Sequence, residues 1–501
     1  MRPLLRALLV LASGLPLVAP AHGQQVSAFE SYQRARRVVD ASLTAMGGSE
    51  RVRGINAVKV RHEGQGFWRN QSPSATGPAA STPTSGLLVI DFQGGRLFWD
   101  NATAFPGGFD NRNQLMISPA EGWGANPYDK RWFSIPNPNI LNNRNLLRRL
   151  PHYFILDALE RSSSLRWLGT GTFRGRRQDV VTYSASDGQQ FTLFFDASTH
   201  LLTKYEQLFT DAQTGDALLE VVWPGYRLVD EVQVPTGRVL RRVNEVAEDV
   251  RFTEFVINPP LPDSLFQKPA GYVDGTGGPV ADTTVLKLGD DVYAVQGVAG
   301  GNTSLVVGFN DHVMVVEAYG NDAASRRTIA RVKELFPGRP IRYLVPTHHH
   351  DDHTGGVRTF IAEGAAIVTT PGNRQYFEGM ARGVYTITPD ALSRNPQPLK
   401  LEMVTGKRRV FSDGTHEVQV IDIGPSPHAD EMLVVYLPKE RIMVQGDLLN
   451  LPIGRIRPGN LTTAHFARWL EQSGLVVDKF VPVHGPIHTP TELRQAIELM
   501  H

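Results

Sequence analysis

The amino-acid sequence predicts a two-domain protein, with an antiparallel β-rich domain over residues 24–270 and a layered α/β domain over residues 283–501. Its 501 residues exceed what a single hydrophobic core usually organises. Apolar residues alternate with a period of two in the first part, whereas strand and helix patterns alternate in the second. Proline and glycine gather around residues 258–262 and 271–279, so we place a linker over residues 271–282.

Composition describes an ordinary soluble globular chain, with 41% hydrophobic and 20% charged residues. The formal net charge of +1 supplies no electrostatic attraction to nucleic acid, so we expect none as a partner. Because the chain contains no cysteine, disulfides and thiolate metal ligands are excluded.

Residues 1–23 have the pattern of a secretory signal peptide. Arg2 and Arg6 accompany an apolar stretch over residues 4–21, and small residues follow it. The stretch is short and broken by prolines, which favours a cleaved signal over a membrane anchor. We therefore expect a periplasmic or secreted protein that has no membrane-spanning segment once the signal is removed.

The β-rich domain begins with a helix, because apolar residues recur at helical spacing from Tyr32 to Met46 and end at a glycine pair. A second helix is predicted over residues 146–159. Residues 71–86 are rich in Ser, Pro, Thr, Ala and Gly and are interpreted as a floppy loop. No cluster of catalytic residues stands out in this domain. Its predicted strands are 58–62, 87–92, 97–99, 180–183, 191–195, 201–205, 218–223, 226–229 and 252–257.

The α/β domain alternates apolar strands with amphipathic helices. Residues 371–410 lie between its core elements, so we expect them to form a rim or lid over the site. There Tyr376, Phe377 and Tyr385 are candidates for apolar contacts with a substrate or for ordinary packing. The predicted strands are 305–307, 313–316, 341–345 and 366–369, and the predicted helices are 322–336 and 357–362.

Four histidines and two aspartates occupy six consecutive positions directly after the strand 341–345. Read as H-x-H-x-D-H, the stretch fits one register only, which selects His348, His350, Asp352 and His353. Imidazole and carboxylate are the ligands that zinc prefers when a reactive water must stay on the metal. Clustering so many ionisable groups without a partner is costly. The stretch therefore predicts a metal site.

Three further candidate ligands follow apolar strands elsewhere in the domain. His428 comes after residues 418–423, Asp447 comes after residues 442–444, and His484 follows another short apolar run. A lone histidine at a strand end is usually structural. Because all three repeat the strand-then-ligand arrangement of the first motif, we include them in the site.

With these residues in place, residues 283–501 resemble the metallo-β-lactamase superfamily. The matching motifs are residues 347–356, His428, Gly446-Asp447 and Val483-His484-Gly485. The resemblance implies a four-layer αββα sandwich with the site at one edge and two zinc ions per chain. His348, His350 and His428 would hold one ion, Asp352, His353 and His484 would hold the other, and Asp447 would bridge both. The same ligand types also suit iron and manganese.

The resemblance also bears on the reaction. It implies a binuclear hydrolase, which the signal pattern of residues 1–23 predicts to be exported. A hydroxide shared by the two zinc ions would attack a small-molecule substrate, with Asp352 as the catalytic residue that orients the hydroxide and relays a proton. A bridging aspartate, in a chain without cysteine, is similar to the glyoxalase II, lactonase and alkylsulfatase branches. We therefore rank ester, thioester, lactone and sulfate-ester substrates above lactams.

The β-rich domain resembles the half-barrel of outer-membrane lipoprotein-sorting carriers. The resemblance is carried by residues 194–196 with 201–204, 225–226 with 234–235, and 261–266. It implies a concave apolar sheet that binds an acyl chain or guides an apolar substrate towards the metals. The alternative function is accordingly a lipid or apolar-ligand carrier with an accessory metal domain.

Overall fold

The computed structural model describes residues 27–105, 109–128, 130–135, 150–275, 283–297, 302–452 and 455–501. The expected signal peptide and residues 276–282 of the expected linker lie outside the described residues. Among the residues that are described, no helix is both long and apolar enough to cross a membrane.

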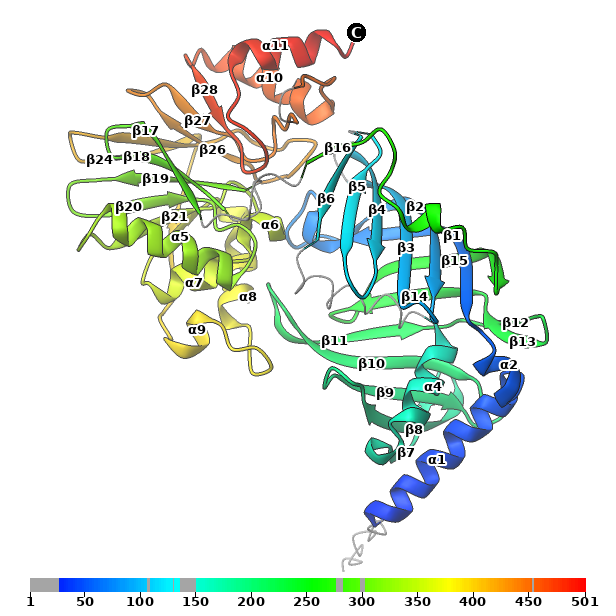
Figure 1. The fold of residues 1–501 in the computed structure, drawn as a ribbon. Coiled ribbons are helices and arrows are strands. Elements are labelled where there is room, and N and C mark those ends of the chain that lie inside the picture. The colour runs from blue at the N-terminus through cyan, green and yellow to red at the C-terminus, as the bar shows by residue number, and fades with distance from the viewer. Residues whose placement is uncertain are drawn as a thin grey trace, which may run out of the picture.

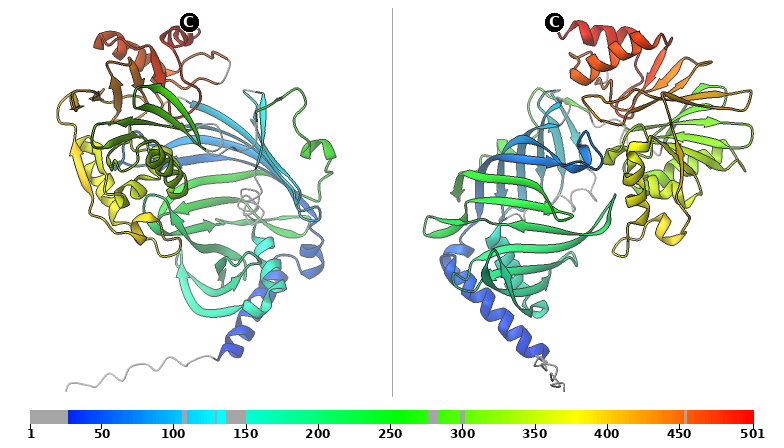
Figure 2. Two further views of the ribbon diagram at one scale, coloured as in Figure 1. Left: turned by 60° about the vertical axis from the view of Figure 1, so that its left-hand side comes forward. Right: turned by 180° about the vertical axis from the view of Figure 1, so that it is seen from behind.

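The N-terminal part is mostly β with a few helices, as predicted, and its main feature is one strongly curved sheet of 14 strands within the described residues (Figures 1 and 2). Neighbouring strands pair antiparallel except at one edge, where β16 runs parallel to β6. This β16, Val273–Asp274, lies inside the stretch assigned to the linker and still pairs with the sheet. In spatial order the strands are β16, β6 (Arg131–Ser134), β5 (Gly122–Asn126), β4 (Phe109–Ile117), β3 (Arg96–Phe105), β2 (Ala80–Asp91), β1 (Ala57–Trp68), β15 (Glu245–Ile257), β14 (Gly237–Arg242), β11 (Gly215–Val222), β10 (Leu202–Asp211), β9 (Gln190–Asp196), β8 (Arg176–Ser184) and β7 (Arg166–Phe173).

Among the described residues, three α-helices and a small hairpin accompany the sheet. The side chain of Ser27 caps α1 (Ala28–Ala45), which buries Ala35, Val39 and Leu43 along one face. Together with α4 (Pro151–Glu160) it packs on the sheet in one apolar cluster, in which the ring centroids of Phe154 on α4 and Tyr205 on the sheet lie 4.5 Å apart. The remaining elements are α2 (Ser49–Arg53), β12 (Tyr226–Val229) and β13 (Val232–Pro235).

Two expectations for the N-terminal part need correction. The second helix begins at Pro151, where proline is favoured in the first turn, and residues 146–149 lie outside the described residues. The floppy loop predicted over 71–86 is wrong for its second half, because β2 begins at Ala80 and pairs with β1 along its whole length. Thr82 and Thr84 are β-branched and fit a pleated surface, which the composition of the stretch concealed.

The C-terminal part contains a seven-stranded and a five-stranded sheet, both counted within the described ranges. The predicted bounds of β20, β21, α7, β22 and β27 agree with the structure. The first sheet is ordered β17 (Thr284–Gly289), β18 (Val292–Gln296), β19 (Thr303–Gly308), β20 (Val313–Val316), β21 (Ile341–Val345), β22 (Ala366–Thr369) and β23 (Lys400–Met403). The second is ordered β24 (Arg408–Ser412), β25 (Glu417–Asp422), β26 (Leu433–Leu437), β27 (Ile442–Val444) and β28 (Lys479–Val481).

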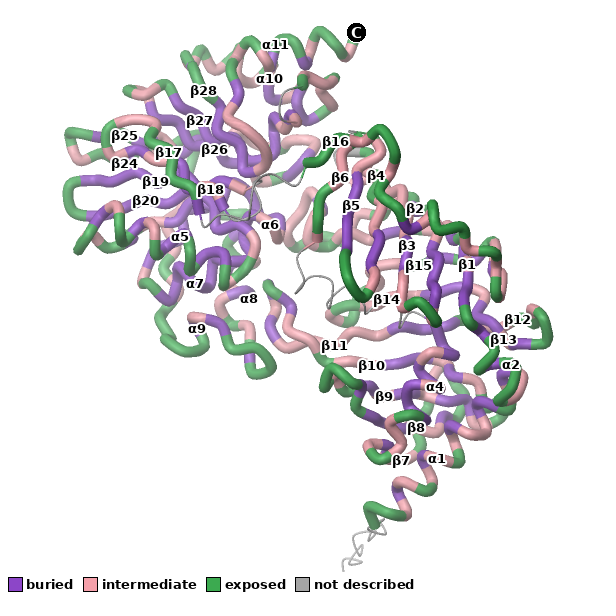
Figure 3. The backbone as a smooth tube through the Cα atoms, in the orientation of Figure 1, coloured by how far each residue is buried: buried purple, intermediate pink, exposed green. Residues whose placement is uncertain are grey.

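Separate apolar clusters hold these layers together. The strands that are covered on both faces, by the other sheet and by helices, are among the most completely buried parts of the chain (Figure 3). One cluster lies between the two sheets and includes Val316, Val345 and Val444. A second joins the larger sheet to its helices, and a third joins the smaller sheet to α10 and α11. The helices of the larger sheet are α5 (Asp322–Leu335), α7 (Val357–Ala362), α8 (Arg374–Arg382) and α9 (Ala391–Arg394), and those of the smaller are α10 (Leu461–Ser473) and α11 (Pro490–Glu498).

His152 offers a test of the packing of α4. It is 3% exposed, contacts the ring of Phe92 edge-on, and burial lowers its pKa to about 4. A histidine with a lowered folded pKa stabilises the fold above its ordinary pKa of 6.5, and that stability is lost as the pH falls towards 4. Between about pH 7.5 and pH 5 this one group should reduce the free energy of unfolding by about 2 kcal/mol. His152→Leu should remove this part of the pH dependence of the free energy of unfolding, as measured by urea unfolding in the presence of a chelator at both pH values. Equal pH dependence in both proteins would contradict this origin.

Candidate metal centre

The histidine-rich motif lies where β21 ends at the edge of the larger sheet. The buried apolar residues of β21 fix the backbone up to Val345, and a one-turn helix, α6 (Asp351–Thr354), follows at once. Thr354 holds this turn closed, because its hydroxyl donates to the carbonyls of His349 and His350 at 3.1 and 2.8 Å. The strand end and the turn together direct four of the predicted side chains to one side.

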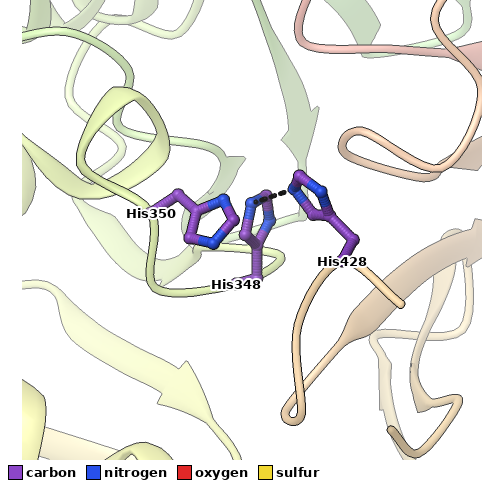
Figure 4. Close-up of side chains that lie close together, drawn as sticks. All are labelled: His348, His350 and His428. Carbon is purple, nitrogen blue, oxygen red and sulfur yellow. Dashed lines mark hydrogen bonds between the residues drawn. The ribbon is translucent and has the colours of Figure 1, made fainter. Parts of the chain in front are cut away.

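All seven predicted ligands come together in two groups. His348, His350 and His428 form the first, and Asp352, His353, Asp447 and His484 form the second. Within each group, one ligand atom from every residue lies within 4.8 Å of the others. Figure 4 shows the first group, in which the imidazoles of His348 and His428 face one another with their Nε2 atoms 3.0 Å apart.

Asp447 lies between the two groups. Its Oδ2 is 3.3 Å from Nε2 of His353 and 3.6 Å from Nε2 of His428, and its Oδ1 is 3.7 Å from Nε2 of His484. The other carboxylate of the second group, Asp352, has its Oδ2 2.8 Å from the same atom of His484. One carboxylate therefore contacts members of both groups.

A second layer of polar groups orients the rings. The hydroxyl of Thr347 lies 3.1 Å from Nδ1 of His348 and donates to Oε1 of the buried Glu317 at 2.5 Å, whose Oε2 is 3.3 Å from Nδ1 of His353. Oδ1 of Asn302 is 2.9 Å from Nδ1 of His484. Such outer contacts fix which ring nitrogen carries the proton and leave the other to bind a metal.

The electrostatics differ between the groups. Burial, followed by the neighbouring imidazoles, lowers the pKa of His348 and His350, so both rings are neutral and have a lone pair available. Burial alone would raise the pKa of Asp447, but the facing His353 and His484 outweigh it and lower this pKa. Burial opposes the charge on His353, yet Asp447 and Asp352 raise the pKa of its ring. The second group therefore favours a positive charge within it.

The donor set fits divalent metal ions. Four ligands about 2.1 Å from a common zinc in a tetrahedron lie roughly 3.4 Å apart, and the contacts above range from 2.8 to 3.7 Å. Nδ1 of His350 and Oδ1 of Asp447 are buried and find no hydrogen-bond partner among the described residues. Buried polar atoms without partners are costly, and a cation would satisfy them together.

A cavity of about 680 Å³ opens beside the centre, and both parts of the chain line it. Asp352, His428, Asp447 and His484 face it from the C-terminal part. The N-terminal sheet supplies much of the remaining wall from the ends of β1, β3, β14 and β15. A small molecule in this cavity would contact the metal ligands and the sheet at once.

The rim or lid expected from residues 371–410 is wrong, because no residue of this stretch lines the cavity. Phe377 is buried in the core beside α7. The hydroxyl of Tyr376 donates to the carbonyl of His349 at 2.7 Å and accepts from Nε2 of Gln213 at 2.6 Å. The hydroxyl of Tyr385 donates to the carbonyl of Ala212 at 2.8 Å. The two tyrosines therefore attach the β10–β11 hairpin to the C-terminal part of the chain.

Several residues of the centre escaped the sequence analysis. Glu317 follows β20 directly and is fully buried, so a strand-then-acid pattern could have indicated it. Asn302 and Gln71 stand in no such pattern. Nε2 of Gln71 donates to Oδ1 of both Asp351 and Asp352, at 2.7 and 2.8 Å, from a stretch interpreted as a floppy loop.

Ligands on the strand ends of a two-sheet α/β domain define a class of metal-centred proteins, and comparison with known families agrees. Residues 297–484 match the model of the metallo-beta-lactamase superfamily. The C-terminal part of the chain belongs to that superfamily, which confirms the resemblance found in the sequence. The family and the two side-chain groups together indicate a metal cofactor.

Two curated relatives are similar to parts of the chain. One is the 2,4-dinitroanisole O-demethylase subunit alpha of Nocardioides sp. (strain JS1661), 24% identical over 176 residues, or 34% of this chain and 49% of the relative. The other is the alkyl/aryl-sulfatase BDS1 of Saccharomyces cerevisiae (strain ATCC 204508 / S288c), 27% identical over 79 residues, or 16% of this chain and 12% of the relative. The matches thus span about half the length of the first relative and much less of the second.

Solved structures that the chain matches in part include a metallo-beta-lactamase from Pontibacter korlensis, at 20% identity and a TM-score of 0.34, covering 44% of this chain and 98% of that one. Another is FIM-1 from Pseudomonas aeruginosa in a mono-zinc form, at 20% identity and a TM-score of 0.35, covering 44% and 95%.

Metal binding should stabilise the folded chain measurably. A ligand that binds only the folded state at about 100 times its Kd adds about 2.7 kcal/mol to the free energy of unfolding. We expect Zn²⁺ added to chelator-treated protein to raise Tm by several degrees, and Mg²⁺, which prefers oxygen ligands, to have little effect. Differential scanning calorimetry provides the measurement. A Tm unmoved by Zn²⁺ would show that the clustered side chains hold no zinc.

Proposed function

We propose that the chain is a binuclear metal-dependent hydrolase acting on a small molecule in the cavity between its two parts. The observation that carries the proposal is the convergence of seven histidine and aspartate side chains on two adjacent points, with Asp447 between them. His348, His350 and His428 would hold one ion, and Asp352, His353 and His484 the other. We further assign the helix–sheet–sheet–helix layers to the superfamily's αββα sandwich.

Zinc is the proposed metal, since neutral imidazoles with few carboxylates suit it best among the divalent ions that these ligands accept. When bound, the ions would supply a water of lowered pKa and a Lewis acid for the substrate's polar group.

The chain's own residues contribute positioning and proton transfer. Asp352 borders the cavity, and its carboxylate is fixed from two sides, by His484 at Oδ2 and by Gln71 at Oδ1. That carboxylate is therefore placed to orient a water and to take up a proton on one of its oxygens. The imidazoles of His348 and His350 are buried and stay neutral, so their role is to bind.

For the reaction, we favour cleavage at an ester-like oxygen over lactam hydrolysis. The curated relatives carry names that describe an aryl methyl ether and alkyl or aryl sulfates as substrates. The residue proposed to bridge the two ions, Asp447, is a carboxylate, and the chain contains no cysteine. These points support esters, thioesters, lactones and sulfate esters ahead of lactams as the proposed substrates.

We also propose that the chain is exported, on the basis of residues 1–23 alone, and that residues 24–270 and 283–501 are its two domains. The periplasm or the exterior is then the site of action. The N-terminal sheet is proposed to contribute to substrate binding, because it lines the cavity.

The deciding experiment is a substrate panel of nitrocefin, lactones, thioesters and sulfate esters, run on protein of measured metal content. We expect two metal ions per chain and turnover of at least one ester-like substrate. Protein that takes up no metal, hydrolyses nothing and binds lipid would support the alternative carrier function instead.

Asp352→Ala should lower kcat on the best substrate by roughly 100-fold or more, as expected for loss of a group that handles the proton. The exposed Asp478 serves as the matched control, and Asp478→Ala should keep the wild-type rate. Circular dichroism and metal analysis establish that both variants fold and load. Near-wild-type kcat in metal-replete Asp352→Ala protein would reject the proposed role.

A further inference from the structure

The part of the cavity wall that the N-terminal sheet supplies is rich in aromatic and aliphatic side chains. Phe67 and Trp68 come from the end of β1, Phe105 from the end of β3, and Leu240 and Val246 from β14 and β15. The ring centroids of Trp68 and Phe105 lie 4.4 Å apart at a tilt of 45°. These residues form an aromatic wall, a name kept below for Phe67, Trp68, Phe105, Leu240 and Val246.

Hydrogen bonds fix the orientation of Trp68 in this wall. Nε1 of Trp68 donates to the hydroxyl of Thr82 at 2.6 Å, and that hydroxyl donates to the carbonyl of Ala104 at 2.6 Å. The indole is thereby tied to β2 and β3, so it presents an ordered apolar surface. A side chain already held in place loses little conformational entropy when a ligand packs on it.

Several of the charged residues on the same side have partners of their own. Nη1 of Arg69 is 3.1 Å from Oε1 of Glu245, and Oδ1 of Asp211 accepts from the backbone and hydroxyl of Thr214 at 3.1 Å each. Glu248 pairs with the buried Arg238. These charged groups are therefore partly neutralised within the protein. The aromatic wall beside them offers a ligand apolar contact.

We infer that the aromatic wall is the subsite for an apolar, aromatic body of the substrate, whose hydrolysable group reaches Asp352 and His484. The inference rests on the proposed function. The cavity volume of about 680 Å³ suits a molecule with one or two rings rather than a methyl or acetyl compound alone. Aromatic rings pack well in offset or edge-on contact with Trp and Phe, and the polar end of the same molecule would lie at the metal ligands.

Binding of 2-naphthol, a ring compound that cannot be hydrolysed, tests the subsite without requiring turnover. We expect isothermal titration calorimetry to detect 2-naphthol binding to the metal-loaded protein. Phe105→Ala and Trp68→Ala should each weaken it about tenfold. Phe133 lies on β6 of the same sheet, is 45% exposed and does not line the cavity, so Phe133→Ala should bind as the wild type does.

Hydrolysis of 2-naphthyl acetate supplies the second readout. Phe105→Ala should raise KM about tenfold and leave kcat within a few-fold, because the wall binds the ring and does not touch the reacting atoms. Naphthol binding that is absent, or equal in all variants, overturns the subsite. Naphthol binding that depends on Phe105, without hydrolysis of any ester, retains the subsite and rejects the proposed reaction.

A different observation concerns the segment that follows β1. A short 3₁₀ turn, Arg69–Gln71, carries the chain from the aromatic wall to the metal centre. There one side-chain amide, Nε2 of Gln71, uses both of its hydrogens on two carboxylates, Asp351 and Asp352. The carbonyl of Ser72 accepts from Nε2 of His350 at 3.0 Å, and the carbonyl of Pro73 accepts from the backbone of Asp430 at 2.8 Å.

Hydrogen bonds also hold the segment after β1 in a defined position. Ser72 is 1% exposed, and its hydroxyl donates to the carbonyl of Trp68 and accepts from the backbone of Ala80 at 2.8 Å. Since the carbonyl of Ser72 can only accept, Nε2 of His350 carries the proton and Nδ1 keeps its lone pair. Nδ1 is the buried atom of His350 that has no partner among the described residues.

We propose that Gln71 is a positioning residue and that the N-terminal domain completes the metal centre of the C-terminal one. Gln71 holds Asp352 in place and relieves its repulsion with Asp351, and Ser72 sets the tautomer of His350. This second proposal also rests on the two-metal centre, but the experiment below requires no catalysis.

Gln71→Met removes the amide and nearly preserves the side-chain length. We expect the weaker of two Zn²⁺ dissociation constants, measured by competition with a chromophoric chelator, to rise 10- to 100-fold, as for other outer partners of metal ligands. Gln207 provides the matched control, since it lies on β10 and its amide donates to Oε1 of Gln189, the residue before β9. Gln207→Met should leave both constants unchanged.

The same samples separate positioning from a merely structural role. A structural role would lower Tm in chelator-treated Gln71→Met and leave the Zn²⁺ constants at their wild-type values, and that result overturns the proposal. Weakened metal binding with an unchanged Tm supports it. Wild-type protein that binds no Zn²⁺ would reject the metal centre and this proposal with it.

Discussion

The whole arrangement depends on holding ionisable side chains close together in a space that water scarcely reaches. Four of the seven, His348, His350, His353 and His428, are at most 4% exposed. Such a cluster is unfavourable unless a cation or a proton satisfies it, so the surrounding backbone must supply the rigidity. The strand ends of two packed sheets do so. Glu317 shows the cost, because its φ of 76° is rare for a residue with a side chain, and there it reaches both Thr347 and His353.

Hydrogen bonds connect the two parts of the chain where the centre lies. The β10–β11 hairpin binds Tyr376 and Tyr385, and Asp216 at its end accepts from the backbone of Thr386 at 2.8 Å. Gly215 follows the turn of this hairpin with a φ of 90°, and a Cβ there would lie 2.2 Å from the carbonyl oxygen of Val384. Only glycine permits this approach. Directional contacts of this kind define the relative position of the two parts more precisely than non-directional apolar contacts would.

The ligands were predictable because each is local in sequence. Each of His428, Asp447 and His484 closely follows an apolar run. A buried strand fixes the backbone at its end, and so it also fixes the direction of the side chains that follow it. For the same reason β20, β21 and β22 have their predicted bounds. Gln71, Ser72 and Asn302 were not predictable, since their relation to the centre exists only after two distant segments meet. The prediction of the cavity wall was wrong for a similar reason. Residues 371–410 were chosen because they lie near the metal ligands in the sequence, whereas β1 lies near them only in the folded chain.

The division of labour between the domains limits what relatives can say about the substrate. The superfamily match begins at residue 297. Every residue of the aromatic wall precedes it in the chain and therefore lies outside the match. Two proteins that share the metal ligands can therefore present different walls to the same reactive centre, and fold alone does not decide the substrate. In this chain two residues of the wall, Phe67 and Trp68, and the positioning amide of Gln71 come from a single stretch of backbone, the end of β1 and the turn after it. A change in that stretch would alter the fit of the substrate and the geometry of Asp352 together, so selectivity and chemistry are coupled through one turn.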